Sequence, residues 1–127
     1  EAAPEAGQSV REGKESNAWS RKNAKRLRAD LINERSRVLK PLKGKIDAVE
    51  REIIELEDRI GREEEELQRA SEIGDGRKIV GLSISIHDGK KLVETLFDEL
   101  EQVSVLYERE AQVFERRMKD LEEGGNN

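Results

Sequence analysis

The residues of this sequence with the clearest chemical meaning are basic side chains between positions 20 and 45. This stretch holds ten Lys or Arg residues against two acids, a balance of +8, whereas residues 1–19 sum to −2 and residues 46–127 to −11. Ammonium and guanidinium groups bind phosphate oxygens, so a basic segment in a chain of net charge −5 indicates a nucleic-acid contact. We expect nine residues to make it: Arg21, Lys22, Lys25, Arg26, Arg28, Arg35, Arg37, Lys40 and Lys43.

The same basic side chains have a second interpretation, as a solvated helix face or as partners of acids on a neighbouring helix. Arg21, Lys22, Lys25 and Arg26 remain the best candidates for an outside partner, since they fall at or beyond the end of that helix in the register given below. Trp19 beside them either stacks on a base or caps the packing of a helix start. The acids available for internal pairing are Glu108, Glu110, Glu115, Asp120, Glu122 and Glu123.

Residues typical of catalysis or metal binding are few. His87 is the only histidine and there is no cysteine, so thiolate sites and disulfides are excluded. The acids Glu63 to Glu66 point in different directions if they are helical, and cannot converge on one ion. The glycines between Gly74 and Gly81 lack the Gly-Lys-Ser/Thr ending of a phosphate loop. We therefore expect no enzyme activity, no catalytic residue, no metal and no cofactor in this chain.

Two apolar ladders with alternating spacings of three and four residues predict the elements that carry these side chains. Such spacing is typical of a coiled coil, and Gly74-Asp-Gly76 between the ladders suits a chain reversal. The fold class is therefore all-α, an antiparallel two-helix coiled-coil hairpin. The first ladder runs Leu39, Leu42, Ile46, Val49, Ile53, Leu56, Ile60, Glu63, Leu67, Ala70, and the second Ile79, Leu82, Ile86, Gly89, Val93, Leu96, Leu100, Val103, Tyr107, Glu110, Phe114.

A reversal at Asp75 fixes the register of the hairpin. Facing residue numbers should add up to about 150, which sets apolar residues opposite one another along most of the seam. Leu56 then lies near Leu96 or Val93. The same register sets Gly61 opposite Gly89, which predicts either a close approach of the two backbones or a tolerated weak point.

A short basic helix is expected to precede the hairpin, with Leu27, Leu31 and Ile32 on one side. Proline lacks an amide donor and disfavours helix at the preceding residue, so Pro41 should break or kink the helix near Lys40. The predicted layout is a flexible linker at 1–19, a basic helix at 20–39, hairpin arms at 41–73 and 77–123, and a disordered tail at 124–127.

Composition supports this layout. Charged residues make up 42% of the chain and aromatic residues 3%, which suits a narrow seam better than a conventional core. No run approaches the roughly 20 apolar residues that cross a bilayer, and the first residues do not resemble a signal peptide. We expect a cytoplasmic protein with no membrane contact that is a monomer in isolation.

The stretch Glu34-Arg-Ser-Arg-Val-Leu-Lys-Pro-Leu-Lys-Gly-Lys-Ile46 and its continuation to Glu57 resemble the C-terminal coiled-coil domain of ABC-F ATPases of the Uup-like type. The resemblance covers roughly residues 21 to 123, and its most specific piece is Arg37 to Ile46. It implies a non-catalytic module that binds DNA or ribosomal RNA at the C-terminus of an ATPase. ATP and Mg²⁺ would belong to that parent only, because this chain has neither a Walker motif nor an ABC signature.

Two other functions remain open on the sequence. The hairpin could be a structural spacer or a protein-interaction arm that docks on the parent ATPase domains or self-associates. It could also be an RNA-binding arm, similar in architecture to the helical hairpin of seryl-tRNA synthetases.

Overall fold

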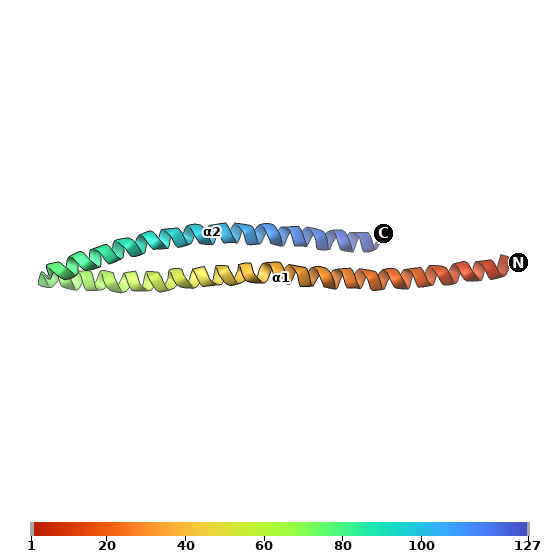
Figure 1. The fold of residues 1–127 in the computed structure, drawn as a ribbon, viewed down its shortest axis with the longest axis horizontal. Helices are drawn as coiled ribbons and strands as arrows, with labels where there is room; N and C mark the ends of the chain where they lie inside the picture. Colours follow the sequence, from red (N-terminus) through yellow and green to blue (C-terminus); the bar gives the residue numbers. More distant parts are fainter. Residues whose placement is uncertain (1, 127) are drawn as a thin grey trace. The chain divides into compact units, whose positions relative to one another are not determined.

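Two helices make up the computed structural model, which describes the backbone of residues 2–126 and the side chains of residues 17–124 (Figure 1). Helix α1 spans Ala2–Ile73 and helix α2 spans Gly76–Asn126, and no strand occurs among the described residues. The predicted all-α helical hairpin is confirmed. The linker predicted at 1–19 and the tail predicted at 124–127 fall almost entirely outside the residues whose side chains are described.

The helical pair divides into two compact units. The turn unit is Lys40–Glu108, and the terminal unit is Glu1–Leu39 with Arg109–Asn127. Each unit combines one segment of α1 with one segment of α2.

The core of the turn unit is the predicted seam. Every ladder position from Leu42 to Ala70 and from Ile79 to Tyr107 is buried or half-buried. Residues that the register sets opposite one another, such as Leu56 and Leu96, belong to the same apolar cluster. The alternating three- and four-residue spacing therefore identified the packed face of both helices. The buried members of the cluster are Val49, Ile53, Leu56, Ile60, Ile86 and Leu96.

The reversal lies where the glycines predict it. Gly74 has a φ of 73°, which a residue with a side chain adopts only with strain. The amide of Gly74 donates to the carbonyl of Ser71 at 3.3 Å and that of Asp75 to the carbonyl of Ala70 at 3.0 Å, the two hydrogen bonds of a Schellman C-cap. The Asp75 carboxylate then accepts a hydrogen bond from the amide of Lys78 at 3.3 Å and caps the start of α2.

Glu63 and Gly89 occupy ladder positions without an apolar side chain, and the seam accommodates each of them differently. Oε1 of Glu63 accepts a hydrogen bond from the Ser85 hydroxyl at 2.9 Å and pairs with Arg59 at 3.3 Å, while Oε2 is buried without a hydrogen-bond partner. Gly89 is buried, and a methyl group there would lie 3.1 Å from Cγ1 of Ile60. A methyl group at exposed Gly61 would meet nothing within 4 Å, so the predicted close approach of the two backbones at Gly61 and Gly89 is wrong, and the other interpretation, a tolerated weak point, stays a prediction.

Helix α1 continues through Pro41, so the predicted break between a basic helix and the first hairpin arm is wrong. Interior proline costs a helix about 3 kcal/mol relative to alanine. Buried Leu39 and Ile46 and half-buried Leu42 hold the helix on either side of Pro41. Packing of these residues outweighs the local preference of the proline.

Packing in the terminal unit corrects a second detail. Leu31 is 7% exposed and Phe114 of α2 is 3% exposed, whereas Ile32 is 49% exposed. Leu27 is also exposed, so of the three apolar residues expected on one side only Leu31 packs. A heptad step back from Leu39 would bury Ile32, but the packed side runs instead through half-buried Val38 and buried Leu31, while exposed Arg35 borders a surface hollow with Leu31 and Phe114.

In the part of the chain that the structure describes, neither helix contains a stretch that is both long and apolar enough to cross a membrane.

Candidate nucleic-acid interface

Four basic side chains lie together on the outer face of α1 in the terminal unit. Half-buried Ala24, buried Leu31 and half-buried Val38 recur every seven residues and mark the side of α1 that packs. At 3.6 residues per turn, the four basic residues are rotated by roughly 80 to 180° about the helix axis from Leu31 on this packed side. They therefore lie on the side of α1 that faces away from the packing. All four are exposed, and we call them the basic stripe: Arg21, Lys22, Lys25 and Arg26.

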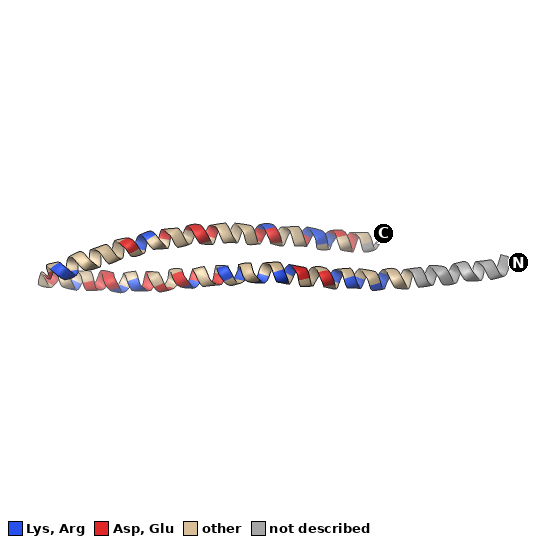
Figure 2. Cartoon of the chain, viewed as in Figure 1, with Lys and Arg blue, Asp and Glu red and all other residues tan. Residues whose placement is uncertain are grey.

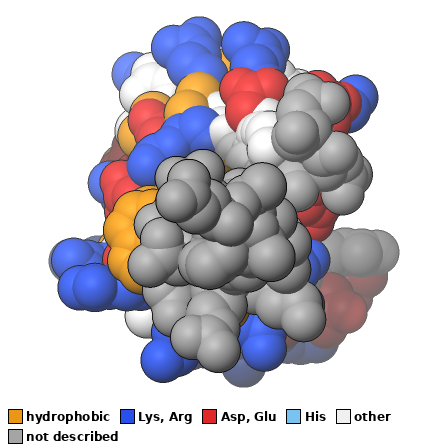
Figure 3. All heavy atoms as spheres, turned by 90° about the vertical axis from the view of Figure 1, so that its right-hand side faces the viewer, with side chains coloured by type: hydrophobic (Ala, Val, Ile, Leu, Met, Phe, Trp, Pro, Cys, Tyr) orange, Lys and Arg blue, Asp and Glu red, His pale blue; other side chains and the backbone are white. Residues whose placement is uncertain are grey.

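No acidic side chain among the described residues forms an ion pair with the basic stripe. The one polar contact is Nε of Arg21, which donates to the carbonyl of Asn17 at 3.5 Å. From position 17 onward, Asp30 is the first acid along α1. Figure 2 shows the resulting run of Lys and Arg on α1, and Figure 3 shows Lys and Arg side chains together with acidic and hydrophobic ones on the face that it draws. The stripe therefore presents four positive charges to solvent.

The structure assigns other roles to three of the predicted site residues. Nη2 of Arg28 lies 3.0 Å from Oε1 of Glu122 on α2. Nζ of Lys43 lies 3.5 Å from Oδ1 of Asp47, one turn along α1. Arg35 lines the hollow beside Leu31 and Phe114. Arg28 and Lys43 are thus already paired with acids of the same chain.

The remaining two predicted residues are exposed. Arg37 belongs to the terminal unit, and Lys40 to the turn unit. Neither forms an ion pair with a described residue. Arg37 lies eleven residues after Arg26, about three helical turns on, so it extends the same outer face of α1.

Internal neutralisation of the basic segment is limited. Of the six acids expected to pair with it, Glu122 alone does so among the described residues, with Arg28. A further pair, between Lys45 of α1 and Glu99 of α2 at 3.7 Å, lies in the turn unit. Most of the predicted internal pairing is therefore not found among the described residues.

In the best-formed ion pair of the terminal unit, the acid lies on α1 and the basic residue on α2. This pair was not predicted from the sequence. Arg117 of α2 donates to both carboxylate oxygens of Glu34, at 3.2 and 3.1 Å. Its guanidinium also lies 5.3 Å from the centre of the Phe114 ring. The hydrogen bond with Arg117, together with the charges of Arg117 and Arg37, lowers the pKa of Glu34. The predicted register sets residues 34 and 117 opposite each other and could have identified this pair.

Trp19 lies on the outer face of α1 near the basic stripe and is 68% exposed. Lys22 follows it by three residues and Arg26 by seven, a spacing that sets all three on one side of a helix. A tryptophan that caps packing would be largely buried, so the exposure of Trp19 does not support the packing interpretation.

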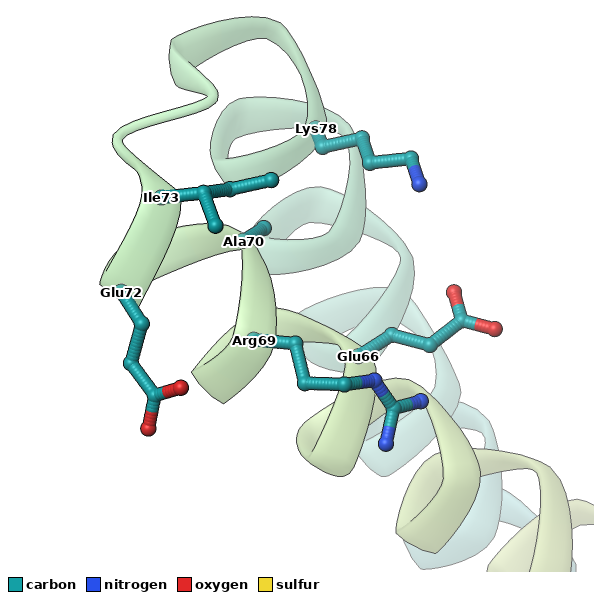
Figure 4. A pocket seen from close by; sticks show the side chains of 6 residues that line it. All are labelled: Glu66, Arg69, Ala70, Glu72, Ile73 and Lys78. Carbon is teal, nitrogen blue, oxygen red and sulfur yellow. The ribbon is translucent and has the colours of Figure 1, made fainter.

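Other groups with possible chemistry do not converge. His87 is exposed, and Glu64 pairs with Lys90 of α2 at 3.2 Å while Glu63 turns into the seam. Within the described residues, no three histidine or acidic side chains come close enough to hold a metal ion. Beside the turn, Figure 4 shows Glu72 pointing away from Glu66 and Arg69 around a surface hollow.

Comparisons of this chain with protein-family models, with curated proteins and with solved structures gave no match.

Proposed function

We propose that this chain is a non-catalytic module that binds DNA or ribosomal RNA through the basic stripe. The observation that carries the proposal is the placement of Arg21, Lys22, Lys25 and Arg26 on one outward face of a single helix, with no described acid paired to them. Four cations fixed on one helix face match a row of phosphates.

The contact is mainly electrostatic. From Arg21 to Arg26 the helix rises about 7.5 Å, and the side chains extend this reach. Long Lys and Arg side chains on a helix face meet phosphate oxygens without reading base edges, so little sequence preference is expected. Arg37 and Lys40, which are exposed, add positive charge further along α1. Arg28 and Lys43 contribute less because each already pairs with an acid.

The segment 34–57 resembles the coiled-coil domain of ABC-F ATPases, and this resemblance suggests the protein to which the module belongs. The module would belong to the C-terminal part of a cytoplasmic ATPase, and ATP and Mg²⁺ would be bound by the parent. Contact with nucleic acid would then reach the parent through α1, which carries the basic stripe.

A charge-reversal variant tests the proposal. Lys22→Glu, Lys25→Glu and Arg26→Glu together should abolish binding of a 20-base-pair duplex that the wild-type chain binds at low salt. The matched control also changes one Arg and two Lys to Glu, at positions outside the basic stripe. These exposed residues are Arg62, Lys78 and Lys91. It should retain the wild-type affinity for the duplex. Equal affinity of the two variants would exclude the basic stripe as the binding site.

One observation favours the alternative, a spacer or protein-interaction arm. Leu92, Val105 and Leu106 of α2, in the turn unit, are 48, 47 and 42% exposed. Apolar side chains in such positions suit a second protein surface, either of the parent ATPase or of another copy. Light scattering distinguishes self-association from the closed hairpin, for which we expect the mass of a monomer.

A further inference from the structure

The exposed indole of Trp19 is the feature that the electrostatic account leaves without a role. Trp19 is 68% exposed, more than the other three aromatic residues: Phe97 is 49% exposed, Tyr107 is half-buried and Phe114 is 3% exposed. Tryptophan carries the largest apolar surface of any residue, and leaving it in water forgoes the free energy of burying it. An exposed tryptophan next to a functional surface therefore suggests a ligand that covers it.

The neighbours of Trp19 define what this ligand must be. Lys22 and Arg26, one and two helical turns away, lie on the same side of α1, at about 5 and 10 Å along the axis. Asn23, four residues after Trp19, is exposed and offers both a hydrogen-bond donor and an acceptor. An aromatic face, two cations and an amide suit a planar ring attached to phosphates.

A base in an intact duplex is not available to this tryptophan. Its faces are covered by the neighbouring base pairs, and only its edges are open in the grooves. Unpaired bases expose their faces and stack on aromatic side chains, while cations beside the aromatic ring hold the backbone. The combination at Trp19 is thus complementary to a single strand rather than to a duplex.

We propose that Trp19 is a stacking platform and that the preferred ligand of this surface is single-stranded nucleic acid with at least one unstacked base. This inference rests on the proposed function, since Lys22 and Arg26 must hold the phosphates on either side of that base. The stripe supplies affinity for any nucleic acid, and Trp19 adds the preference for a single strand.

The test uses the fluorescence of Trp19, which is the only tryptophan in the chain. A 20-nucleotide oligothymidylate should quench this fluorescence on binding, and an abasic oligomer of the same length should bind more weakly without quenching. A matching oligouridylate distinguishes RNA from DNA. Loss of one stacked base should weaken binding of the single strand by about 5- to 150-fold in Trp19→Ala.

The control variants separate stacking from charge. Trp19→Phe should retain most of the single-strand affinity, while Trp19→Leu should lose it as Trp19→Ala does. All three should bind the 20-base-pair duplex as the wild type does. Circular dichroism should show the same helix content for each variant, because the replaced side chain is exposed.

Two outcomes would overturn the inference. Unchanged Trp19 fluorescence at a saturating single strand, or wild-type affinity of Trp19→Ala for it, would remove the stacking role while duplex binding by the stripe stands. If the charge reversal of Lys22, Lys25 and Arg26 leaves the binding of every nucleic acid unchanged, the inference fails together with the proposed function.

Discussion

Glu34 and Arg117 show how single residues tie α1 to α2 in the terminal unit. Both side chains are about half exposed, and the two hydrogen bonds between them are bidentate. Bidentate geometry makes the pair stronger than a typical surface ion pair. The pKa of Glu34 is lowered from its usual 4.5 chiefly by the hydrogen bond with Arg117. This shift makes the contribution of the pair to stability depend on pH.

We expect Glu34→Gln to lower the melting temperature near neutral pH and to have no such effect in strong acid. A carboxyl group whose folded pKa is lowered stabilises the fold at pH values above its unfolded pKa. That contribution disappears as the pH falls through the lowered pKa of Glu34. Thermal melting of both proteins, followed by circular dichroism between pH 7 and pH 2, measures the difference.

Glu115→Gln is the control for this experiment, because Glu115 is exposed and forms no ion pair with a described residue. Its melting temperature should follow that of the wild type over the same pH range. A difference between wild type and Glu34→Gln that stays constant with pH would show that Arg117 does not stabilise the ionised form of Glu34.

Gly61 and Gly89 should respond differently to alanine. Nothing lies within 4 Å of a methyl group at Gly61, so Gly61→Ala gains helix propensity and stabilises by about 1 kcal/mol. At Gly89 the new methyl group would lie 3.1 Å from Ile60, and displacement of Ile60 offsets the gain. Urea unfolding gives both values. A Gly89→Ala gain as large as that of Gly61→Ala would contradict the close contact with Ile60.

For single residues, the sequence predicts exposure well, because exposure follows from helical spacing. It predicts ion pairs less well, because an ion pair depends on which residue of the other helix lies opposite. The exposure of the basic stripe follows from helix periodicity. The pairing of Arg28 with Glu122 was among the possibilities, but that of Glu34 with Arg117 required the register to be applied to every charge. Gly61 was set opposite Gly89 only because their residue numbers add up to 150. Gly61 directly follows the seam residue Ile60 on the helix and therefore faces solvent.

At the scale of elements, the apolar ladders predicted the packed face of α1 and α2 because a heptad repeat has one geometric solution over many turns. The turn was predictable for a similar reason, since Gly74 adopts a φ that disfavours other residues. The ends of the basic helix were not predictable. Pro41 acts locally, whereas Leu39, Leu42 and Ile46 act through their burial, which helix propensity does not include.

Pro41→Ala distinguishes a continuous helix from a break at this position. If α1 is continuous, alanine restores a backbone hydrogen bond and removes a clash, which should raise the free energy of unfolding by about 1–3 kcal/mol. Lys40→Ala, at an exposed neighbouring position, should change it by less than about 0.5 kcal/mol. A neutral or destabilising Pro41→Ala would indicate that proline instead begins a new helix there.

For the whole molecule, the distribution of charge matters more than its sum. The chain has a net charge of −5, yet residues 20–45 carry a balance of +8. An acidic remainder repels phosphates, so a nucleic acid should be confined to the basic segment. Within that segment, the basic stripe is the part with no described ion pair. Binding through four phosphates should therefore depend steeply on salt.

The most direct test is the salt dependence of duplex binding by the wild-type chain and by the triple variant of Lys22, Lys25 and Arg26 to Glu. Four phosphate contacts predict a slope of log affinity against log salt of about −3.6, or about 150-fold weaker binding at 200 mM than at 50 mM salt. The triple variant should show a slope near −1 or no binding at all. Equal slopes for the two proteins, or a wild-type slope near zero, would contradict the account.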